Sequence, residues 1–120
     1  MWRHLARRDW RLVRRLLAIG ELKDAGFHLH QALEKFLKAF LSEHGQPVPT
    51  THELPALLAL AERQIHSLLR FRSLCERISW YYLLRLPTRA PVLDENEVRQ
   101  TLNDSRPLIR ALFPDEPAVR

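Results

Sequence analysis

One apolar stretch, Phe27 to Leu41, constrains the fold more than any other part of this chain. At helical spacing its apolar side chains fall on one side of a helix. These are Leu29, Ala32, Leu33, Phe36, Leu37 and Phe40. The other side is polar, with Glu34 and a stripe of three donors, Gln31, Lys35 and Lys38, spaced to be neighbours on a helix surface. We therefore predict the central core helix here, with a polar stripe that is either a site or a solvated face.

The remaining sequence repeats the same apolar period of three to four residues and contains only three glycines. This pattern predicts an all-α fold. At 120 residues, the chain has room for a single core. We expect one domain over residues 1–120, with its core at about 5–113 and a frayed tail at 114–120. Short connections between the helices favour an up-and-down antiparallel bundle of four to five helices.

Start and stop signals give the expected helix limits. Helices are predicted over about 2–18, from about 26 to 43, over 51–61 and from about 67 to 85, with a fifth beginning near 94. Gly45 followed by prolines ends the second helix. Capping boxes at 50–53 and 94–97 open the third and fifth. Pro107 should kink the fifth helix or split it, with Asp104 or Ser105 capping the second piece.

The tyrosine-containing fourth helix is expected to bury one stripe and to carry an arginine at its end. Tyr82 lies on the predicted stripe and Tyr81 on its flank, while Arg85 extends its stem along the core. The stripe comprises Leu68, Phe71, Cys75, Ile78 and Tyr82.

Several classes of protein are disfavoured by composition. The single cysteine, Cys75, rules out an internal disulfide and a cysteine-based metal site. His30 and Glu34 are spaced to share a ligand, but no second pair completes a metal site, and we expect neither a metal nor a cofactor. No apolar run approaches the ~18 residues that a membrane span requires. We expect a cytoplasmic protein.

The net charge of +5 is concentrated in the first twenty residues, which hold six arginines against Asp9. One interpretation is an electrostatic footprint for phosphates, and the other is a solvated helix face. We favour the solvated face, because we expect no aromatic side chain on the arginine face itself that could stack on bases. Asp9 itself falls on the apolar stripe of this helix, where a carboxylate needs a partner from another helix.

Three segments together resemble the HEPN domain. The first contains the most specific motif, Gln-Ala-x-Glu-Lys-x-x-Lys-Ala, at residues 31–39; the others are Thr-His-Glu-Leu at 51–54 and Tyr-Tyr-Leu-Leu-Arg-Leu-Pro at 81–87. The resemblance covers about residues 5–113. It implies a helical bundle, usually a homodimer, often encoded beside a minimal nucleotidyltransferase as a toxin–antitoxin or nucleotide-transfer pair.

Many members of the family resembled are metal-independent ribonucleases that carry an Arg followed four to six residues later by a His. That spacing precedes none of the six histidines here, since only two residues separate Arg63 from His66. We therefore expect no catalytic residue of this kind and favour a binding module over an enzyme. The alternatives are a divergent ribonuclease that uses Arg63 with His66 or His52, and a non-catalytic dimerisation scaffold.

The resemblance also implies the residues of a site. Asp9 and Glu34 are interpreted as structural polar partners. Two lysines one turn apart and a bidentate arginine would suit a nucleotide or RNA phosphate. An open alternative is that Asp9 pairs with Arg85, while the lysines pair with Glu34 or with another subunit. The implied phosphate-binding residues are Lys35, Lys38, Arg85, Gln31, His52 and Tyr81.

Overall fold

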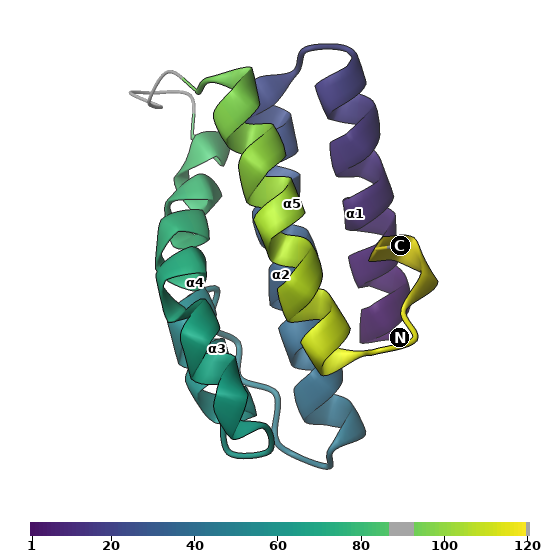
Figure 1. The fold of residues 1–120 in the computed structure, drawn as a ribbon, viewed down its shortest axis with the longest axis vertical. Coiled ribbons are helices and arrows are strands. Elements are labelled where there is room, and N and C mark those ends of the chain that lie inside the picture. The colour runs from purple at the N-terminus through teal and green to yellow at the C-terminus, as the bar shows by residue number, and fades with distance from the viewer. Residues whose placement is uncertain (87–92, 120) are drawn as a thin grey trace.

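A computed structural model describes residues 1–86 and 93–119, and within these ranges the ordered elements are all helical (Figure 1). The all-α prediction is confirmed. Five α-helices are joined by short 3₁₀ helices, labelled η. In chain order the elements are α1 (Trp2–Ala18), α2 (Leu22–Glu43), α3 (Leu54–Ala61), η1 (His66–Phe71), α4 (Arg72–Ser79), η2 (Trp80–Arg85), α5 (Glu95–Leu112) and η3 (Pro117–Val119).

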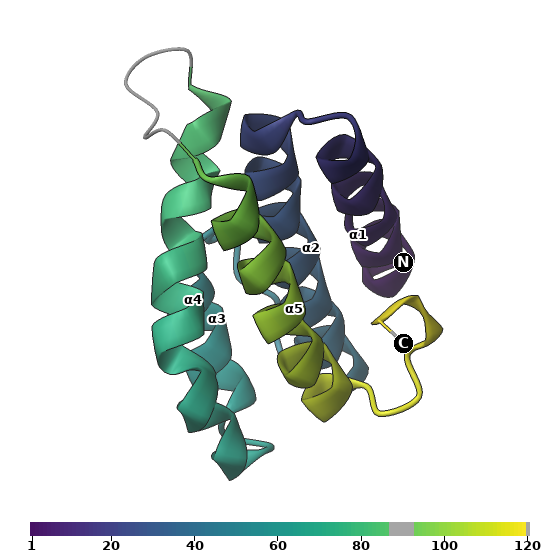
Figure 2. The ribbon, with the colours of Figure 1, turned by 45° about the horizontal axis from the view of Figure 1, so that its top comes forward.

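Helix α2 is the centre of the bundle, as predicted. It packs against α1, α3, α4, η2 and α5, and Figures 1 and 2 show it behind α5, between α1 and the α3–α4 side. All six apolar residues predicted for its core face are at most 1% exposed. The helix ends at Glu43 with His44 as its C-cap residue, and Gly45 follows with φ +70°, a conformation that favours glycine. The central helix is therefore enclosed on several sides, including the side of its polar stripe.

Helix α3 begins at Leu54, three residues later than predicted, and the capping box at 50–53 is wrong. Glu53 is the N-cap residue and makes no side-chain cap, while the Thr51 hydroxyl accepts from the Glu53 N–H. Pro55 explains the late start, because a proline is tolerated in the first turn but interrupts the hydrogen bonding of a helix already under way.

The predicted fourth helix is three elements, η1, α4 and η2, and its end has a different register. A 3₁₀ helix has three residues per turn, so side chains at i and i+3 lie one above the other. The buried residues are accordingly Ile78, Tyr81 and Leu84, and Tyr82 is only half-buried. Tyr81, rather than Tyr82, belongs to the core, and Arg85 is exposed.

Helix α5 continues through Pro107, so the predicted split is wrong. Asp94 is its N-cap and accepts from the Asn96 N–H, which confirms the predicted start. Ser105 caps no second piece, since its hydroxyl donates to the Thr101 carbonyl within the helix.

The segment after Pro114, expected to fray, is folded against the bundle. Val119 is fully buried, and its carbonyl accepts from Arg106 and Arg110 at 3.3 and 3.1 Å. Glu116 is 2% exposed and pairs with Arg7 of α1 at 2.8 Å. Arg7 lowers the pKa of this carboxyl below its ordinary value, against the opposing effect of burial.

Among the described residues, no helix combines the length and the apolar character needed to cross a membrane.

Candidate functional site

Two carboxylates are held against α2, and each pairs with one histidine and one lysine. The first is Asp9 of α1, which is 8% exposed. Its Oδ1 accepts from His28 Nδ1 at 2.9 Å, and its Oδ2 pairs with Lys35 Nζ. Both partners come from α2, so this network fastens α1 to the central helix. The predicted need of Asp9 for a partner from another helix is confirmed.

The second carboxylate, Glu34, belongs to α2 itself and is 4% exposed. Its Oε2 accepts from Lys38 Nζ at 3.0 Å, one helical turn away, and its Oε1 accepts from His52 Nδ1 at 2.9 Å. Lys38 is as buried as its partner, and its ammonium lies 5.5 Å from the centroid of the Trp2 ring. This network connects α2 to the segment before α3, because His52 lies two residues ahead of that helix.

A third histidine, His30, lies beside Glu34 and is fully buried. Its Nε2 donates to the backbone carbonyl of His52 at 2.9 Å, while its Nδ1 is 3.8 Å from Glu34 Oε1. Burial lowers the pKa of His30 to about 4, and the nearby Glu34 carboxylate only partly opposes that effect. His30 is therefore a neutral histidine at pH 7, and it fixes the backbone that presents His52.

A stack of polar and aromatic side chains reaches the surface beside the Glu34 network. The ring of Tyr82 stacks on His52, with centroids 4.7 Å apart and planes within 17°, and lies 5.2 Å from His30. The Arg85 guanidinium lies 4.4 Å from the Tyr82 centroid. His52 and Arg85 are exposed, so this stack forms the solvent-facing edge of the site.

The structure places the implied phosphate-binding residues in different environments. Lys35 and Lys38 are each paired with a carboxylate, whereas Arg85 pairs with no carboxylate among residues 1–86 and 93–119. Tyr81 packs in the core, where its hydroxyl contacts Thr101 of α5 at 3.3 Å and burial raises its pKa. Gln31 Oε1 is buried and has no donor among the described residues.

The proposed alternative pairings are half right. Lys38 pairs with Glu34, as that alternative states. The Asp9–Arg85 pair is wrong, because Asp9 is taken by His28 and Lys35 while Arg85 stacks on Tyr82.

Sequence reasoning missed three residues of this site. His28 and His30 are two residues apart and point in different directions on a helix, so the sequence does not place them in one site. Each lies beside a different carboxylate, His28 beside Asp9 and His30 beside Glu34. Tyr82 was assigned to the core because α-helical spacing was assumed where the chain forms a 3₁₀ helix. For His28, a signal was available, since it precedes Lys35 by two helical turns and shares its face.

Of the residues of the alternative ribonuclease, His52 lies at the opposite end of α3 from Arg63 and His66. Arg63 and His66 are exposed and follow α3, while His52 precedes it. The eight residues of α3 separate the two ends by about 12 Å at 1.5 Å per residue. Among the described residues, no three histidine, cysteine or acidic side chains gather as a metal ion would require. Cys75 is buried, and burial raises its pKa to about 12, so its thiol is unreactive.

A helical bundle with a polar network on its central helix is the class of protein that the fold and the site define. The family model for the HEPN domain matches residues 1–113. The chain therefore belongs to the HEPN domain family, a family of modules related to nucleotides and RNA. Comparison with curated proteins gives no match, and comparison with solved structures gives none either.

Proposed function

We propose that this chain is a non-catalytic HEPN module that holds a nucleotide or RNA phosphate at the exposed edge of the Glu34 network. The observation that carries this proposal is the stack of Arg85, Tyr82 and His52, in which an exposed guanidinium without a carboxylate partner among the described residues lies over an aromatic ring. Guanidinium groups bind phosphates through two parallel hydrogen bonds, and aromatic rings stack on bases.

The buried networks support a binding role through the positions that they fix. Glu34 holds His52, and His30 holds the His52 carbonyl, so the exposed edge rests on a rigid base. Lys35 is about one-quarter exposed and adds positive charge, although Asp9 partly neutralises it. In this proposal Lys38 and Glu34 position the site and do not touch the ligand, because both are buried and paired with each other.

The proposed partners are a second copy of the chain and a minimal nucleotidyltransferase, in a toxin–antitoxin or nucleotide-transfer pair. HEPN domains often dimerise. Helix η2 offers an apolar ridge for this contact: Trp80, Leu83 and Leu86 are 69%, 44% and 41% exposed and follow one another at the three-residue period of a 3₁₀ helix. A dimer formed there would bring two copies of Arg85 close together. Light scattering of Trp80→Lys tests this, and an unchanged dimer mass would contradict it.

Isothermal titration with nucleoside triphosphates and with short RNA tests the binding proposal. Wild type should release heat with at least one of these ligands. Arg85→Gln should weaken that binding about tenfold, as expected for the loss of a charge-assisted bidentate contact, and Arg77→Gln, on the adjacent helix α4, should not. No heat for any ligand, with or without the nucleotidyltransferase partner, contradicts the proposal.

The ribonuclease alternative has its own test. Cleavage of RNA that survives replacement of Arg63, His66 and His52 together by alanine would exclude the arrangement that the sequence offers for it.

A further inference from the structure

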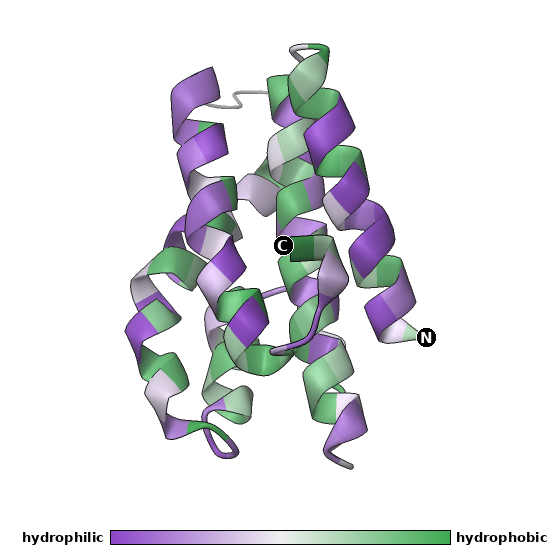
Figure 3. Ribbon diagram, turned by 45° about the vertical axis from the view of Figure 1, so that its right-hand side comes forward, coloured by the Kyte–Doolittle hydropathy of each residue, from purple (hydrophilic) through white to green (hydrophobic). Residues whose placement is uncertain are grey.

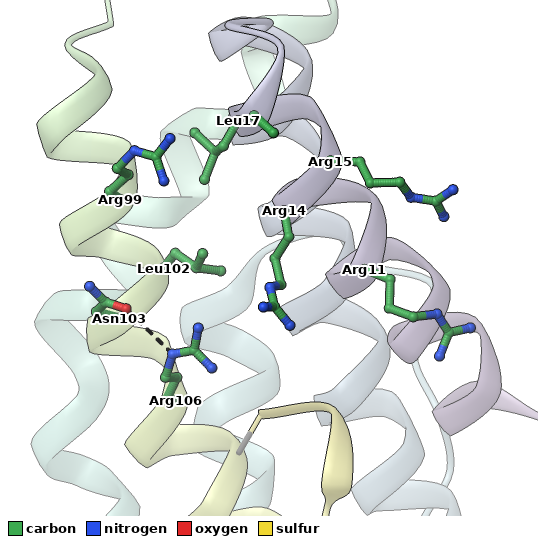
Figure 4. A pocket seen from close by; sticks show the side chains of 9 residues that line it. Arg11, Arg14, Arg15, Leu17, Arg99, Leu102, Asn103 and Arg106 are labelled. Atoms are coloured by element: carbon green, nitrogen blue, oxygen red, sulfur yellow. Dashed lines mark hydrogen bonds between the residues drawn. The ribbon is translucent and has the colours of Figure 1, made fainter.

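A groove of about 680 Å³ lies between α1 and α5, away from the Glu34 network, and arginines dominate its lining (Figure 4). No acidic side chain is among the described residues that line it. The lining consists of Arg11, Arg14, Arg15, Leu17, Ala18, Arg99, Leu102, Asn103 and Arg106.

The groove exists because of how the two helices pack. Helices α1 and α5 both contact α2 but make at most marginal contact with each other, and the groove lies between them. Figure 2 shows α2 behind the space between these two helices. Leu17 and Leu102, both buried, give it an apolar base. Helix η3 packs on both α1 and α5 and bounds the channel at one end. Figure 3 shows hydrophilic residues, in purple, along much of the visible side of α1 and the beginning of α5.

The side chains divide into a central group and an outer edge. In Figure 4, Arg14 of α1 and Arg106 of α5 point toward one another across the channel, and Arg99 extends into it from α5. Arg11 and Arg15 point away from α5, along the outer edge of α1. A bound anion would therefore meet guanidinium groups from both walls.

The arginines of α1 have two different environments. Arg3 pairs with Glu43 at 2.6 Å and Arg7 pairs with Glu116 at 2.8 Å. The other four are not paired with any carboxylate in the described part of the chain, and three of them line the groove. These four are Arg8, Arg11, Arg14 and Arg15. On α5, Arg99 has only an exposed contact with Glu95, at 3.3 Å.

The crowding of like charges is unfavourable in the free protein. Burial lowers the pKa of Arg106 below its ordinary value, and the nearby charges of Arg14 and Arg110 lower it further. Arg106 remains charged at any ordinary pH, so an anion between the walls would remove this repulsion. A negatively charged ligand in the groove would therefore neutralise guanidinium groups that repel one another in the free protein.

We propose that the α1–α5 groove binds consecutive phosphates of a single RNA strand, without reading its sequence. This inference rests on the proposed nucleic-acid-binding function and assigns it a second surface. Arg99 and Arg106 are separated by about 10 Å along α5, so their guanidinium groups would meet different phosphates of one strand. No aromatic side chain lines the groove, so base stacking on a ring is not available there.

The size of the groove favours one strand over a duplex. A volume of about 680 Å³ lies in the range of pockets that enclose a drug-sized molecule, about 300–1,000 Å³. It can take a few linked nucleotides of one strand but not the full width of a double helix. A free triphosphate would reach only part of the arginine row, so we expect it to bind more weakly than a strand.

Fluorescence anisotropy with the whole chain and a 5′-labelled ten-residue oligouridylate tests this inference. Arg14→Gln/Arg99→Gln removes one cation from each wall. Arg70→Gln/Arg72→Gln is the matched control, because Arg70 is exposed and Arg72 has an exposed i,i+4 contact with Glu76, as Arg99 has with Glu95. The unfolding midpoint of each variant confirms that it folds.

We expect the Arg14→Gln/Arg99→Gln variant to bind the oligouridylate about tenfold or more weakly. The slope of log K against log salt concentration should become shallower by about 1.4, because two phosphate contacts are lost. The control should change by less than about twofold. Uridine triphosphate and inorganic tripolyphosphate, added as competitors, should displace the strand only at higher concentrations.

Other results overturn the inference in distinguishable ways. Equal losses in the two double variants would mean that only net charge matters. Equal competition by tripolyphosphate would assign the groove to a free polyphosphate, and tighter binding of a duplex would assign it to double-stranded nucleic acid. RNA binding that is lost in Arg85→Gln but kept in the groove variant would refute the groove and support the Arg85 site. No RNA binding by wild type would refute the groove, whereas the Arg85 proposal is contradicted only if nucleoside triphosphates also give no heat in the titration.

Discussion

The two sides of helix α1 present cations in opposite ways. On the side that faces α2, Lys35 pairs with Asp9 and Lys38 pairs with Glu34. On the side that faces α5, three arginines of α1 lie along a groove whose lining has no acidic residue. Buried charges are tolerated only when they are paired, whereas exposed cations can remain unpaired until a ligand arrives. We infer that the buried ion pairs of the first region maintain the fold. The proposed binding belongs to exposed cations without carboxylate partners among the described residues, namely Arg85 at the edge of the Glu34 network and the arginines of the groove.

The difference also explains why the buried lysines are poor phosphate ligands. Lys38 would have to leave Glu34, and a phosphate would have to enter a site that is at most 5% exposed. Arg14 is exposed, and among the described residues it has no carboxylate partner that it would have to leave. Substitutions should therefore affect stability in one region and binding in the other, and four predictions examine this, beginning with the largest expected effect on stability.

Glu34→Ala should cause the greatest destabilisation, about 3–5 kcal/mol, because it leaves the buried ammonium of Lys38 unpaired. The free energy of unfolding in urea measures it. The double variant Glu34→Leu/Lys38→Met removes both charges and should recover most of the loss. A cost below about 1 kcal/mol for Glu34→Ala would show that the pair is not buried in solution.

Acidification should destabilise the fold through His30. Its pKa is about 4 in the folded protein against 6.5 for an ordinary histidine. The neutral form is favoured in the fold, so this contribution is complete above pH 6.5 and is lost as the unfolded chain takes up the proton between pH 6.5 and 4. The loss approaches about 3 kcal/mol at 1.36 kcal/mol per pKa unit. His30→Gln should remove this part of the pH dependence, and an identical pH profile in the variant would refute it.

Asp9→Asn should cost about 2 kcal/mol, less than Glu34→Ala. The reason is that Lys35 and His28 are each about one-quarter exposed and can turn to water when the carboxylate is removed. Thermal unfolding followed by circular dichroism measures this. RNA affinity should stay within about twofold of wild type, and a large loss of affinity would move the binding site to this network.

Arg85→Ala should have the smallest effect on stability, about 0.5–1 kcal/mol, which is the value of an exposed cation–π contact. Its effect on ligand binding should be much larger. A stability loss of several kcal/mol would instead make Arg85 a structural residue.

Much of the first region could be predicted from the sequence. The apolar period of 27–41 identified the central helix, and the place of Asp9 on an apolar stripe identified a carboxylate that needed a partner. Both inferences depend on spacing within one helix, which the sequence displays directly. The burial of Tyr81 in place of Tyr82 could not be predicted. Nothing in the local sequence distinguishes a helix of three residues per turn from one of 3.6 over only two turns.

The groove and the folded tail depend on residues far apart in the chain. Arg7 and Glu116 are separated by 109 residues, and neither signals the other in sequence. The basic side of α5 could not be recognised from the sequence either, because the basic and acidic residues of 21–120 are equal in number and give no net charge. Only the packing of α1 and α5 on the same central helix places Arg14 opposite Arg106.

A pair of substitutions on one helix tests the central comparison most directly. Arg7→Gln and Arg14→Gln remove the same charge from α1, but only Arg7 has a buried partner, Glu116. Unfolding free energy and affinity for oligouridylate are measured on both variants. We predict that Arg7→Gln loses about 2 kcal/mol of stability and keeps its RNA affinity, while Arg14→Gln keeps its stability within about 0.5 kcal/mol and loses affinity. Equal effects of the two substitutions in both assays would contradict the account.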